Sequence, residues 1–203
     1  MDKRDLRKLF LERRAQVSAI EATMAGEAMA SLLSGEPCWR EARSVFCFLS
    51  VAGEPDTAPI ILRALAEGKT ACVPRTAADR AMEAVPIIAL SRLTEGWPLS
   101  YGIPEPPASY PAMDAAGLDL VIVPSLAVDI WGYRLGHGGG YYDRFIARFQ
   151  NEQKRPLFSA IQFARFVQHE ALPREDYDMK VDVILTENEI IASTTKYCVG
   201  LTR

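Results

Sequence analysis

Short apolar runs alternate along this chain with longer stretches in which apolar residues recur at helical spacing. The short runs are typical of buried strands, and the longer stretches predict amphipathic helices. The predicted strands are residues 44–49, 70–74, 82–87, 119–124, 157–162 and 181–186. The predicted helices are residues 2–16, 19–33, a segment after Thr57, and 141–149, with a capping-box pattern from Ser18 to Glu21.

Residues 44–74 carry the clearest evidence for the fold. A strand, a helix and a second strand follow one another there, with Thr57 as the expected N-cap of the helix and Gly68 as its expected stop. This order is the βαβ unit of a parallel sheet. We therefore expect an α/β fold in which residues 1–203 form a single three-layer domain. Helices at 1–34 precede a mostly parallel, Rossmann-like sheet with flanking helices at 44–187, and residues 188–203 form an edge tail.

The most distinctive stretch is Gly132-Tyr-Arg-Leu-Gly-His-Gly-Gly-Gly-Tyr-Tyr-Asp-Arg144, which lies between a predicted strand and a predicted helix. Its glycines let main-chain N–H groups approach phosphate oxygens without a side chain in the way. A Walker loop would place Lys and then Ser or Thr after the last glycine, and a dinucleotide fingerprint would follow the first strand. The stretch is therefore an anion-binding loop of another type, or a turn shaped by backbone geometry alone.

Two side chains beside the glycines favour anion binding. Arg134 is a fixed cation whose guanidinium can make forked contacts with phosphate. Asp143 is a hard oxygen ligand suited to magnesium, the usual companion of a triphosphate. Asp143 also lies in the first turn of the predicted helix, where a carboxylate stabilises the helix without any metal.

The segment from Arg134 to Asp143 resembles the signature of the 5-formyltetrahydrofolate cyclo-ligase family, whose members are also called methenyltetrahydrofolate synthetases. The resemblance runs in the family's order from about residue 3 to about residue 187. The other similar segments are residues 3–7, 54–57, 73–75, 102–106 and 178–182. The glycine loop with its Tyr-Tyr-Asp end is specific to the family, whereas the other segments are weak evidence alone.

This resemblance implies a carbon–nitrogen ligase that uses ATP and magnesium to cyclise 5-formyltetrahydrofolate to 5,10-methenyltetrahydrofolate, with release of ADP and phosphate. The formyl oxygen is phosphorylated on the way. The resemblance implies catalytic roles for Arg134, Tyr142 and Asp143, and magnesium ligation by Asp143 and Asp178. The implied ATP-binding residues are Lys3, Arg7, Arg134, Leu135, Gly136, His137, Gly138, Gly139, Gly140, Tyr141 and Tyr142.

The reduced folate is expected at Glu54 and Tyr141, and at the loop that carries Tyr101 and Glu105. In the family, the glutamate that matches Glu54 holds the folate. Glu54 also follows a predicted strand, at the edge where open α/β sheets bind ligands. The loop at 97–111 is rich in Pro, Gly and Tyr, and it could form a wall for a flat pterin ring or simply cross the domain.

Structural roles stay open for several of these residues. Lys3 and Arg7 share one helix face and could be a solvated basic end, although the matching family residues reach ATP. Glu54 could be an exposed loop acid. Asp182, close to Asp178, could cap or pair within the fold.

The sequence departs from the family pattern at Gly139, where many members carry lysine. The phosphates then lack one mobile cation, which Lys3, Arg7 or Arg144 could replace. His137 occupies a variable position, where a partly charged imidazole could contact phosphate near neutral pH.

Composition limits the classes of binding partner and the cellular compartment that we expect for this chain. The formal net charge of −3 gives no general attraction to nucleic acid or acidic membranes, so an anion site must be local. No run approaches the roughly 20 apolar residues of a membrane span. The four cysteines are scattered, as expected for free thiols in a reducing cytosol. We expect a cytoplasmic monomer or weak homodimer whose partners are ATP and a reduced folate.

Two other functions fit the same sequence. One is a paralogous ATP-dependent enzyme that acts on another pterin or on a sugar phosphate. The other is a non-catalytic nucleotide-binding module, and the presence of both Asp143 and Asp178 argues against it.

Overall fold

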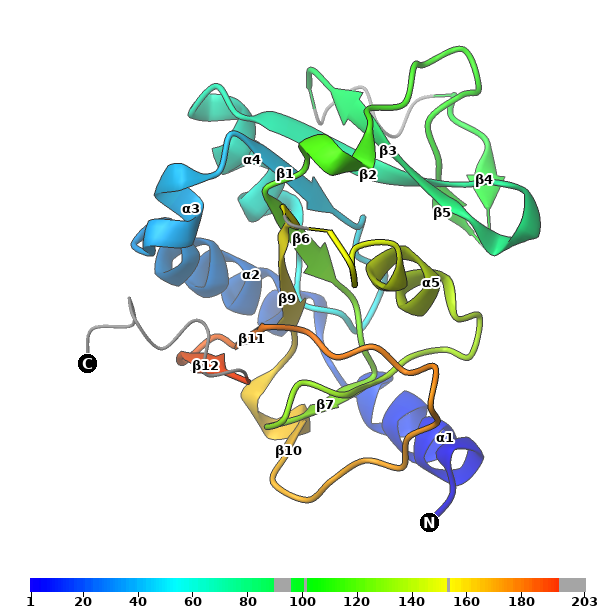
Figure 1. Cartoon of the computed structure of the whole chain (residues 1–203). Helices are drawn as coiled ribbons and strands as arrows, with labels where there is room; N and C mark the ends of the chain where they lie inside the picture. Colours follow the sequence, from blue (N-terminus) through cyan, green and yellow to red (C-terminus); the bar gives the residue numbers. More distant parts are fainter. Residues whose placement is uncertain (90–95, 101, 153, 194–203) are drawn as a thin grey trace.

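The structure, a computed structural model, describes residues 1–89, 96–100, 102–152 and 154–193 (Figure 1). Its main feature is a seven-stranded sheet in the order β12-β11-β9-β6-β1-β2-β3. The strands are β1 (Ser44–Cys47), β2 (Thr70–Thr76), β3 (Met82–Ile87), β6 (Leu120–Val123), β9 (Leu157–Ile161), β11 (Val183–Leu185) and β12 (Ile190–Ala192). The central strands are parallel, and the edge strands β3 and β12 are antiparallel to their neighbours. The predicted α/β fold with a mostly parallel sheet is confirmed.

Helices cover both faces of this sheet. Helices α2 (Ala19–Ser34), α3 (Pro37–Glu41) and α4 (Ala58–Ala66) lie on one face, α5 (Tyr141–Ala147) lies on the other, and α1 (Lys3–Arg14) lies beyond the end of the sheet (Figure 1). No helix in the described part of the chain is long and apolar enough to cross a bilayer.

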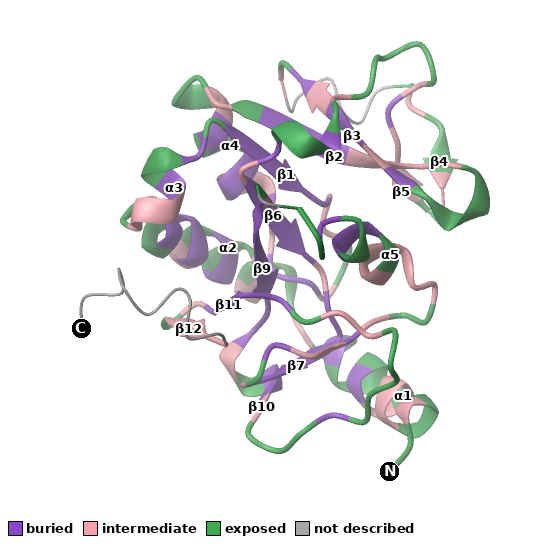
Figure 2. Ribbon diagram, in the orientation of Figure 1, coloured by how far each residue is buried: buried purple, intermediate pink, exposed green. Residues whose placement is uncertain are grey.

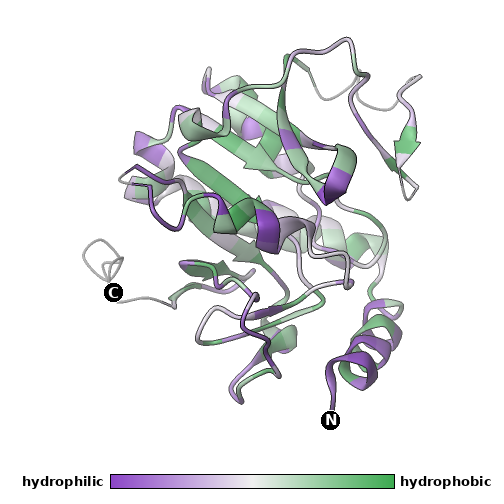
Figure 3. Ribbon diagram, turned by 45° about the vertical axis from the view of Figure 1, so that its right-hand side comes forward, coloured by the Kyte–Doolittle hydropathy of each residue, from purple (hydrophilic) through white to green (hydrophobic). Residues whose placement is uncertain are grey.

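Strand β1 shows how one apolar run supplies two core layers. Val45 and Cys47 pack in the cluster that includes residues of α2 and α4, whereas Phe46 packs in the cluster that includes residues of α5. Successive side chains of a strand point to opposite faces, so a strand covered on both sides is apolar throughout. The central strands β1, β6, β9 and β11 are accordingly buried throughout (Figure 2) and strongly apolar (Figure 3).

Thr57 is the N-cap residue of α4, as predicted, but its side chain makes no capping hydrogen bond. Its hydroxyl donates to the main-chain oxygen of Phe48 (2.8 Å) and accepts from the N–H of Ser50 (3.1 Å). The side chain of Asp56 caps the helix instead, because its Oδ1 accepts the N–H of Ala58 at 2.9 Å. Thr57 therefore ties the start of α4 back to the loop that follows β1.

The other two predicted helix signals are confirmed. Ser18 Oγ accepts the N–H of Glu21 at 3.1 Å at the start of α2. Gly68 follows the end of α4 with a φ of +73°, a left-handed conformation that favours glycine.

A small second sheet, which the sequence pattern did not predict, holds the glycine loop. Its strands, in the order β10-β7-β8, are β7 (Ala127–Asp129), β8 (Arg134–Leu135) and β10 (Val167–Gln168). Buried Asp129 closes the β7–β8 turn by accepting the N–H groups of Trp131 (3.1 Å) and Tyr133 (3.0 Å). Strands of two or three residues are too short to show a period in sequence. The remaining elements are β4 (Leu99–Ser100), β5 (Ile103–Pro104), and the 3₁₀ turns η1 (Ala78–Arg80), η2 (Ala115–Gly117) and η3 (Ala164–Phe166).

The large sheet has a topological switch point between β1 and β6. These strands are neighbours, but β1 leads to β2 on one side and β6 leads to β9 on the other. Connections that diverge in this way leave the carboxyl ends of the two strands accessible, and open α/β sheets bind ligands at such points. The loop at 48–57 follows β1, and the small sheet with the glycine loop follows β6.

Gly26 fixes the packing of α2 against the loop at 48–57. A Cβ added at Gly26 would lie 2.1 Å from the main-chain oxygen of Asp56, so Gly26→Ala forces the two segments apart. We expect this change to lower the free energy of unfolding by about 1–3 kcal/mol, although alanine favours the helix by about 0.5–1 kcal/mol. Urea denaturation measures the effect. Ser31→Ala, on the exposed side of α2, is the control, and an equally small change in both variants would refute the packing argument.

Candidate functional site

A buried ion pair joins the glycine loop to α5. Arg134 of β8 donates from Nη2 to Asp143 Oδ1 at 3.0 Å, and from Nη1 to the main-chain oxygen of Met179 at 2.6 Å. Burial lowers the pKa of Arg134, and the charges of Asp143 and Asp178 oppose that shift. Since arginine stays protonated in proteins, the site contains a fixed positive charge held by two other segments of the chain.

The two predicted magnesium ligands lie on adjoining segments. Asp143 Oδ1 also accepts the N–H of Met179 at 3.0 Å, and Met179 directly follows Asp178. Asp178 Oδ2 accepts the N–H of Glu175 at 2.6 Å and forms an ion pair with Lys3 of α1. Among the described residues, no hydrogen bond reaches Oδ2 of Asp143 or Oδ1 of Asp178.

These carboxylates fit a magnesium ion that takes most of its ligands from outside the protein. Across the described ranges, no group of three or more His, Cys, Asp or Glu side chains is placed to hold a metal ion. Magnesium is commonly bound by one or two carboxylates, with phosphate oxygens and water completing its coordination. Asp143 and Asp178 each keep one carboxylate oxygen, Oδ2 and Oδ1 respectively, that makes no hydrogen bond among the described residues and is available to such an ion.

The backbone explains only part of the glycine content of the loop. Gly138 and Gly140 have φ angles of +98° and +69°, which residues with side chains rarely adopt. Gly136 has no positive φ, and a Cβ there would meet nothing within 4 Å. Turn geometry therefore accounts for Gly138 and Gly140, whereas Gly136 leaves open space beside the main chain.

Two guanidinium groups lie against the main chain of this loop. Arg7 of α1 donates from Nε to the oxygen of Gly136 at 2.9 Å, and Arg144 of α5 donates from Nη1 to the oxygen of Gly139 at 3.0 Å. A Cβ at Gly139 would lie 2.9 Å from the ring of Tyr141, so a lysine there would require that ring to move. Arg7 and Arg144 are therefore already placed beside the loop that lacks a lysine.

His137 does not carry the partial charge expected from the sequence. Its Nε2 lies 3.1 Å from Nη1 of Arg14, and a guanidinium can only donate, so Nε2 is the acceptor. Burial lowers the pKa of His137, and the positive charges of Arg14 and Arg7 lower it further. The imidazole is therefore neutral near pH 7, and this expectation is corrected.

Glu54 is buried, which excludes the reading of an exposed loop acid. Its Oε1 pairs with Nη1 of Arg14 at 3.0 Å, and its Oε2 accepts the N–H of Val51 at 2.9 Å. Burial raises the pKa of Glu54, and the charge of Arg14 opposes that rise. Arg14 was not among the residues predicted for the site. Its spacing of seven residues from Arg7, two helical turns, places both on one face of α1 and was the available signal.

The hydroxyl of Tyr142 is buried and has no hydrogen-bond partner among the described residues. Burial raises its pKa, with smaller contributions from Cys47 and Glu54, and the charge of Arg134 acts in the opposite direction. A buried polar group without a partner is uncommon in proteins and is often found at functional sites.

The other predicted folate contacts are less closely associated with the site. Tyr101 lies outside the described residues. Glu105 accepts hydrogen bonds from the N–H (3.1 Å) and the hydroxyl (3.0 Å) of Thr76, at the carboxyl end of β2. Within the described ranges, Glu105 makes no hydrogen bond to the glycine loop or to Glu54.

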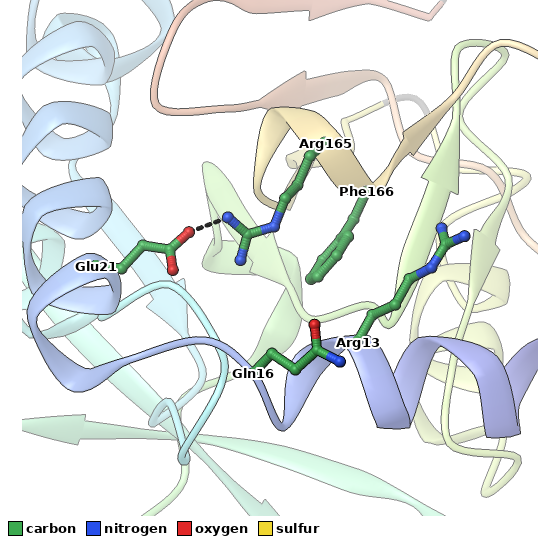
Figure 4. Close-up of a pocket in the computed structure, with 5 residues that line it drawn as sticks. All are labelled: Arg13, Gln16, Glu21, Arg165 and Phe166. Carbon is green, nitrogen blue, oxygen red and sulfur yellow. Dashed lines mark hydrogen bonds and ion pairs between the residues drawn. The ribbon is translucent and has the colours of Figure 1, made fainter.

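A hollow of about 420 Å³ lies between the end of α1, the start of α2 and η3, and is separate from these residues. Figure 4 shows its lining, in which Arg165 forms an ion pair with Glu21. The lining residues are Arg13, Gln16, Glu21, Arg165 and Phe166. None of them belongs to the predicted site. The hollow is therefore not the candidate site.

Comparisons with known proteins agree on one family. The sequence model of the 5-formyltetrahydrofolate cyclo-ligase family matches residues 1–187, which include every predicted site residue. The 5-formyltetrahydrofolate cyclo-ligase of Mus musculus is 28% identical over 191 residues, which are 92% of this chain and 94% of the relative. The enzyme of that name from Escherichia coli (strain K12) is 27% identical over 190 residues, covering 90% and 98%.

Solved structures show the same fold. The NMR structure of Aquifex aeolicus 5,10-methenyltetrahydrofolate synthetase has a TM-score of 0.79 and 29% identity, covering 95% of this chain and 93% of its own. A 5,10-methenyltetrahydrofolate synthetase from Mycoplasma pneumoniae has a TM-score of 0.70, with 92% and 99% coverage. At 18% identity, the second likeness concerns the fold alone.

The Arg134–Asp143 pair should contribute to stability in the absence of any ligand. Asp143→Asn keeps an oxygen for the N–H of Met179 but leaves the buried guanidinium without its closest countercharge. Breaking a fully buried pair costs about 3–5 kcal/mol, and Asp143 is partly exposed, so we expect a loss of about 1–3 kcal/mol. Guanidinium chloride denaturation tests this against Asp176→Asn, an exposed acid in the same loop as Asp178. Equal stability of the two variants would mean that the pair is energetically unimportant.

Proposed function

This chain belongs to the 5-formyltetrahydrofolate cyclo-ligase family, and we propose that it uses ATP to convert 5-formyltetrahydrofolate to 5,10-methenyltetrahydrofolate. The supporting observation is that two sets of residues meet at the switch point between β1 and β6. Glu54 follows β1, and the glycine loop with Arg134 follows β6. A phosphoryl transfer between two substrates needs neighbouring sites that hold both in line.

In this proposal the triphosphate of ATP lies along the glycine loop. Main-chain N–H groups of residues 135–142 bind phosphate oxygens, and Arg7 and Arg134 provide guanidinium groups. Lys3 joins them from α1, where its ion pair with Asp178 already holds it beside the site. Magnesium bound by Asp143 and Asp178 would neutralise part of the triphosphate charge.

The reduced folate lies on the side of Glu54. The carboxylate of Glu54 accepts hydrogen bonds from pterin N–H groups, and the ring of Tyr141 packs against the substrate. We also assign Tyr101 and Glu105 to the wall of this pocket. Support for Glu105 comes from its position at the carboxyl end of β2, on the same edge of the sheet as Glu54.

The chemistry requires activation of an amide-like formyl group, whose oxygen is a poor leaving group. Transfer of the γ-phosphoryl group to that oxygen forms a phosphate ester and releases ADP. The neighbouring amine nitrogen of the folate then attacks the formyl carbon and loses its proton to solvent, and phosphate leaves with the oxygen. Arg134 stabilises charge on the transferred group, Asp143 orients Arg134, and no covalent enzyme intermediate is needed.

We further propose that the chain acts in the cytoplasm as a single domain, as a monomer or weak homodimer. Cys38, Cys47 and Cys72 are free, and burial raises the pKa of the Cys72 thiol to about 12. Unpaired buried thiols fit a reducing compartment. A relative from Arabidopsis thaliana is named as mitochondrial, so location varies among the relatives.

An absorbance assay for the methenyl product tests the proposed reaction. Purified protein is mixed with 5-formyltetrahydrofolate, ATP and magnesium, and each component is omitted in turn. We expect product only when all of them are present. ATP hydrolysis with another pterin, or a thermal shift with Mg-ATP but no methenyl product, would support a paralogous enzyme or a nucleotide-binding module instead.

Tyr142→Phe separates a catalytic role of the hydroxyl from a structural one. Removing a buried hydroxyl that has no partner should leave the free energy of unfolding unchanged or raise it by about 1 kcal/mol. If the hydroxyl binds the reacting groups, kcat/KM should fall at least about tenfold, which is roughly 1.4 kcal/mol in the barrier. Tyr110→Phe, on the exposed loop, is the matched control. Full activity of Tyr142→Phe would remove the hydroxyl from the mechanism.

A further inference from the structure

One buried arginine contacts both loops of the site. Arg14 is the last residue of α1, and its side chain is 9% exposed. Its Nε and Nη2 each donate to the main-chain oxygen of Ala52 at 3.2 Å. Its Nη1 lies 3.0 Å from Glu54 Oε1 and 3.1 Å from His137 Nε2. A single guanidinium therefore spans the loop after β1 and the glycine loop after β6.

The loop after β1 is shaped around this side chain. Gly53 has a φ of +81°, and a Cβ there would lie 2.6 Å from both Cγ and the main-chain oxygen of Arg14. Any larger residue at position 53 would push Arg14 away from Glu54. Both oxygens of Glu54 are engaged, one by Arg14 and one by the N–H of Val51, so the direction of the carboxylate depends on where the guanidinium of Arg14 lies.

The contact with His137 extends this constraint to the glycine loop. Because the imidazole accepts from Arg14, its orientation is set by the same group that orients Glu54. Gly136 and Gly138, on either side of His137, have little side-chain packing of their own, since a Cβ at either would meet nothing closer than 3.7 Å. Arg14 therefore restrains the imidazole of His137, while Arg7 holds the neighbouring main chain at Gly136.

We propose that Arg14 is a positioning residue that couples the two substrate sites, so that nucleotide at the glycine loop strengthens binding of the reduced folate at Glu54. The inference rests on the proposed function, because it needs a nucleotide on one side and a folate on the other. The physical reason is shared ordering. A ligand that fixes His137 also fixes Arg14, and the second ligand then meets a Glu54 that is already oriented.

The measured quantity is a coupling factor, the ratio of the folate dissociation constants without and with nucleotide. Isothermal titration calorimetry gives both values with 5-formyltetrahydrofolate, and the nucleotide is magnesium with a non-hydrolysable β,γ-imido analogue of ATP. We expect a factor of about fivefold or more in the unmodified protein, within the usual range for coupled sites. By linkage, folate must change the affinity of the analogue by the same factor.

Three variants separate coupling from folding. Arg14→Lys keeps a charge for Glu54 but cannot contact Ala52, Glu54 and His137 together, so the factor should fall towards one. His137→Ala removes only the contact with the glycine loop, and it should also bring the factor towards one while folate alone still binds. Arg13→Ala is the control, since Arg13 lines the separate hollow (Figure 4). Its guanidinium lies over the ring of Phe10 and has no contact with Glu54 or His137 among the described residues.

Each outcome is decisive. A coupling factor near one in the unmodified protein, or the same factor in all variants, overturns the role of Arg14 while leaving the proposed function intact. A protein that binds neither the analogue nor the folate refutes the proposed function itself, and the inference falls with it. If Arg14→Lys lowers the melting temperature but leaves the coupling factor unchanged, Arg14 stabilises the fold and does not couple the two sites.

Discussion

The buried charge of Arg134 is the constraint on which the arrangement of the site depends. A guanidinium removed from water is costly unless charged and polar partners surround it. Asp143 and the main-chain oxygen of Met179 are those partners, and they come from α5 and from the segment before β11. Meeting this one requirement brings β8, α5 and the segment before β11 to the same point. The glycine loop begins at that point, so its position follows from the ion pair.

The local concentration of cations explains how a chain with a net charge of −3 can offer an anion site. Salt screens exposed charges beyond about 10 Å, so only groups near the loop matter. Arg7 and Arg144 contact the loop directly, and Arg134 lies at its base. Their guanidinium groups meet main-chain oxygens or a carboxylate on one side. Their remaining N–H groups are the means by which they could bind phosphate.

Helix α1 contributes to the site alongside the loop after β1 and the glycine loop. It lies beyond the end of the sheet in Figure 1, and it contributes Lys3, Arg7 and Arg14 from its first, second and last turns. Its apolar attachment includes Phe10, whose ring packs edge-on against that of Phe166 with centroids 6.0 Å apart. The polar contacts of α1 thus reach the loop after β1, the glycine loop and the segment at Asp178. A helix that contacts the fold partly through site residues links folding of the N-terminal segment to assembly of the site.

The sequence by itself determined six of the seven strands of the large sheet, because six apolar runs, two of them in a βαβ unit, carry a strong local pattern. It did not predict the edge strand β12, which lies in the stretch expected to be a tail. The sequence also identified the glycine loop and the family, because the Tyr-Tyr-Asp end of the loop is specific to the family. The structure agrees with two of the glycines in the loop, since Gly138 and Gly140 have the positive φ that favours glycine. Tertiary structure alone decided what the side chains contact. The partnership of Arg14 with Glu54 joins residues 40 positions apart, and that of Arg14 with His137 joins residues 123 positions apart. No period or propensity records such pairs, since they arise only when the sheet brings the ends of β1 and β6 together. The neutral His137 and the unpartnered hydroxyl of Tyr142 depend on burial, which the neighbours in space set and the neighbours in sequence do not.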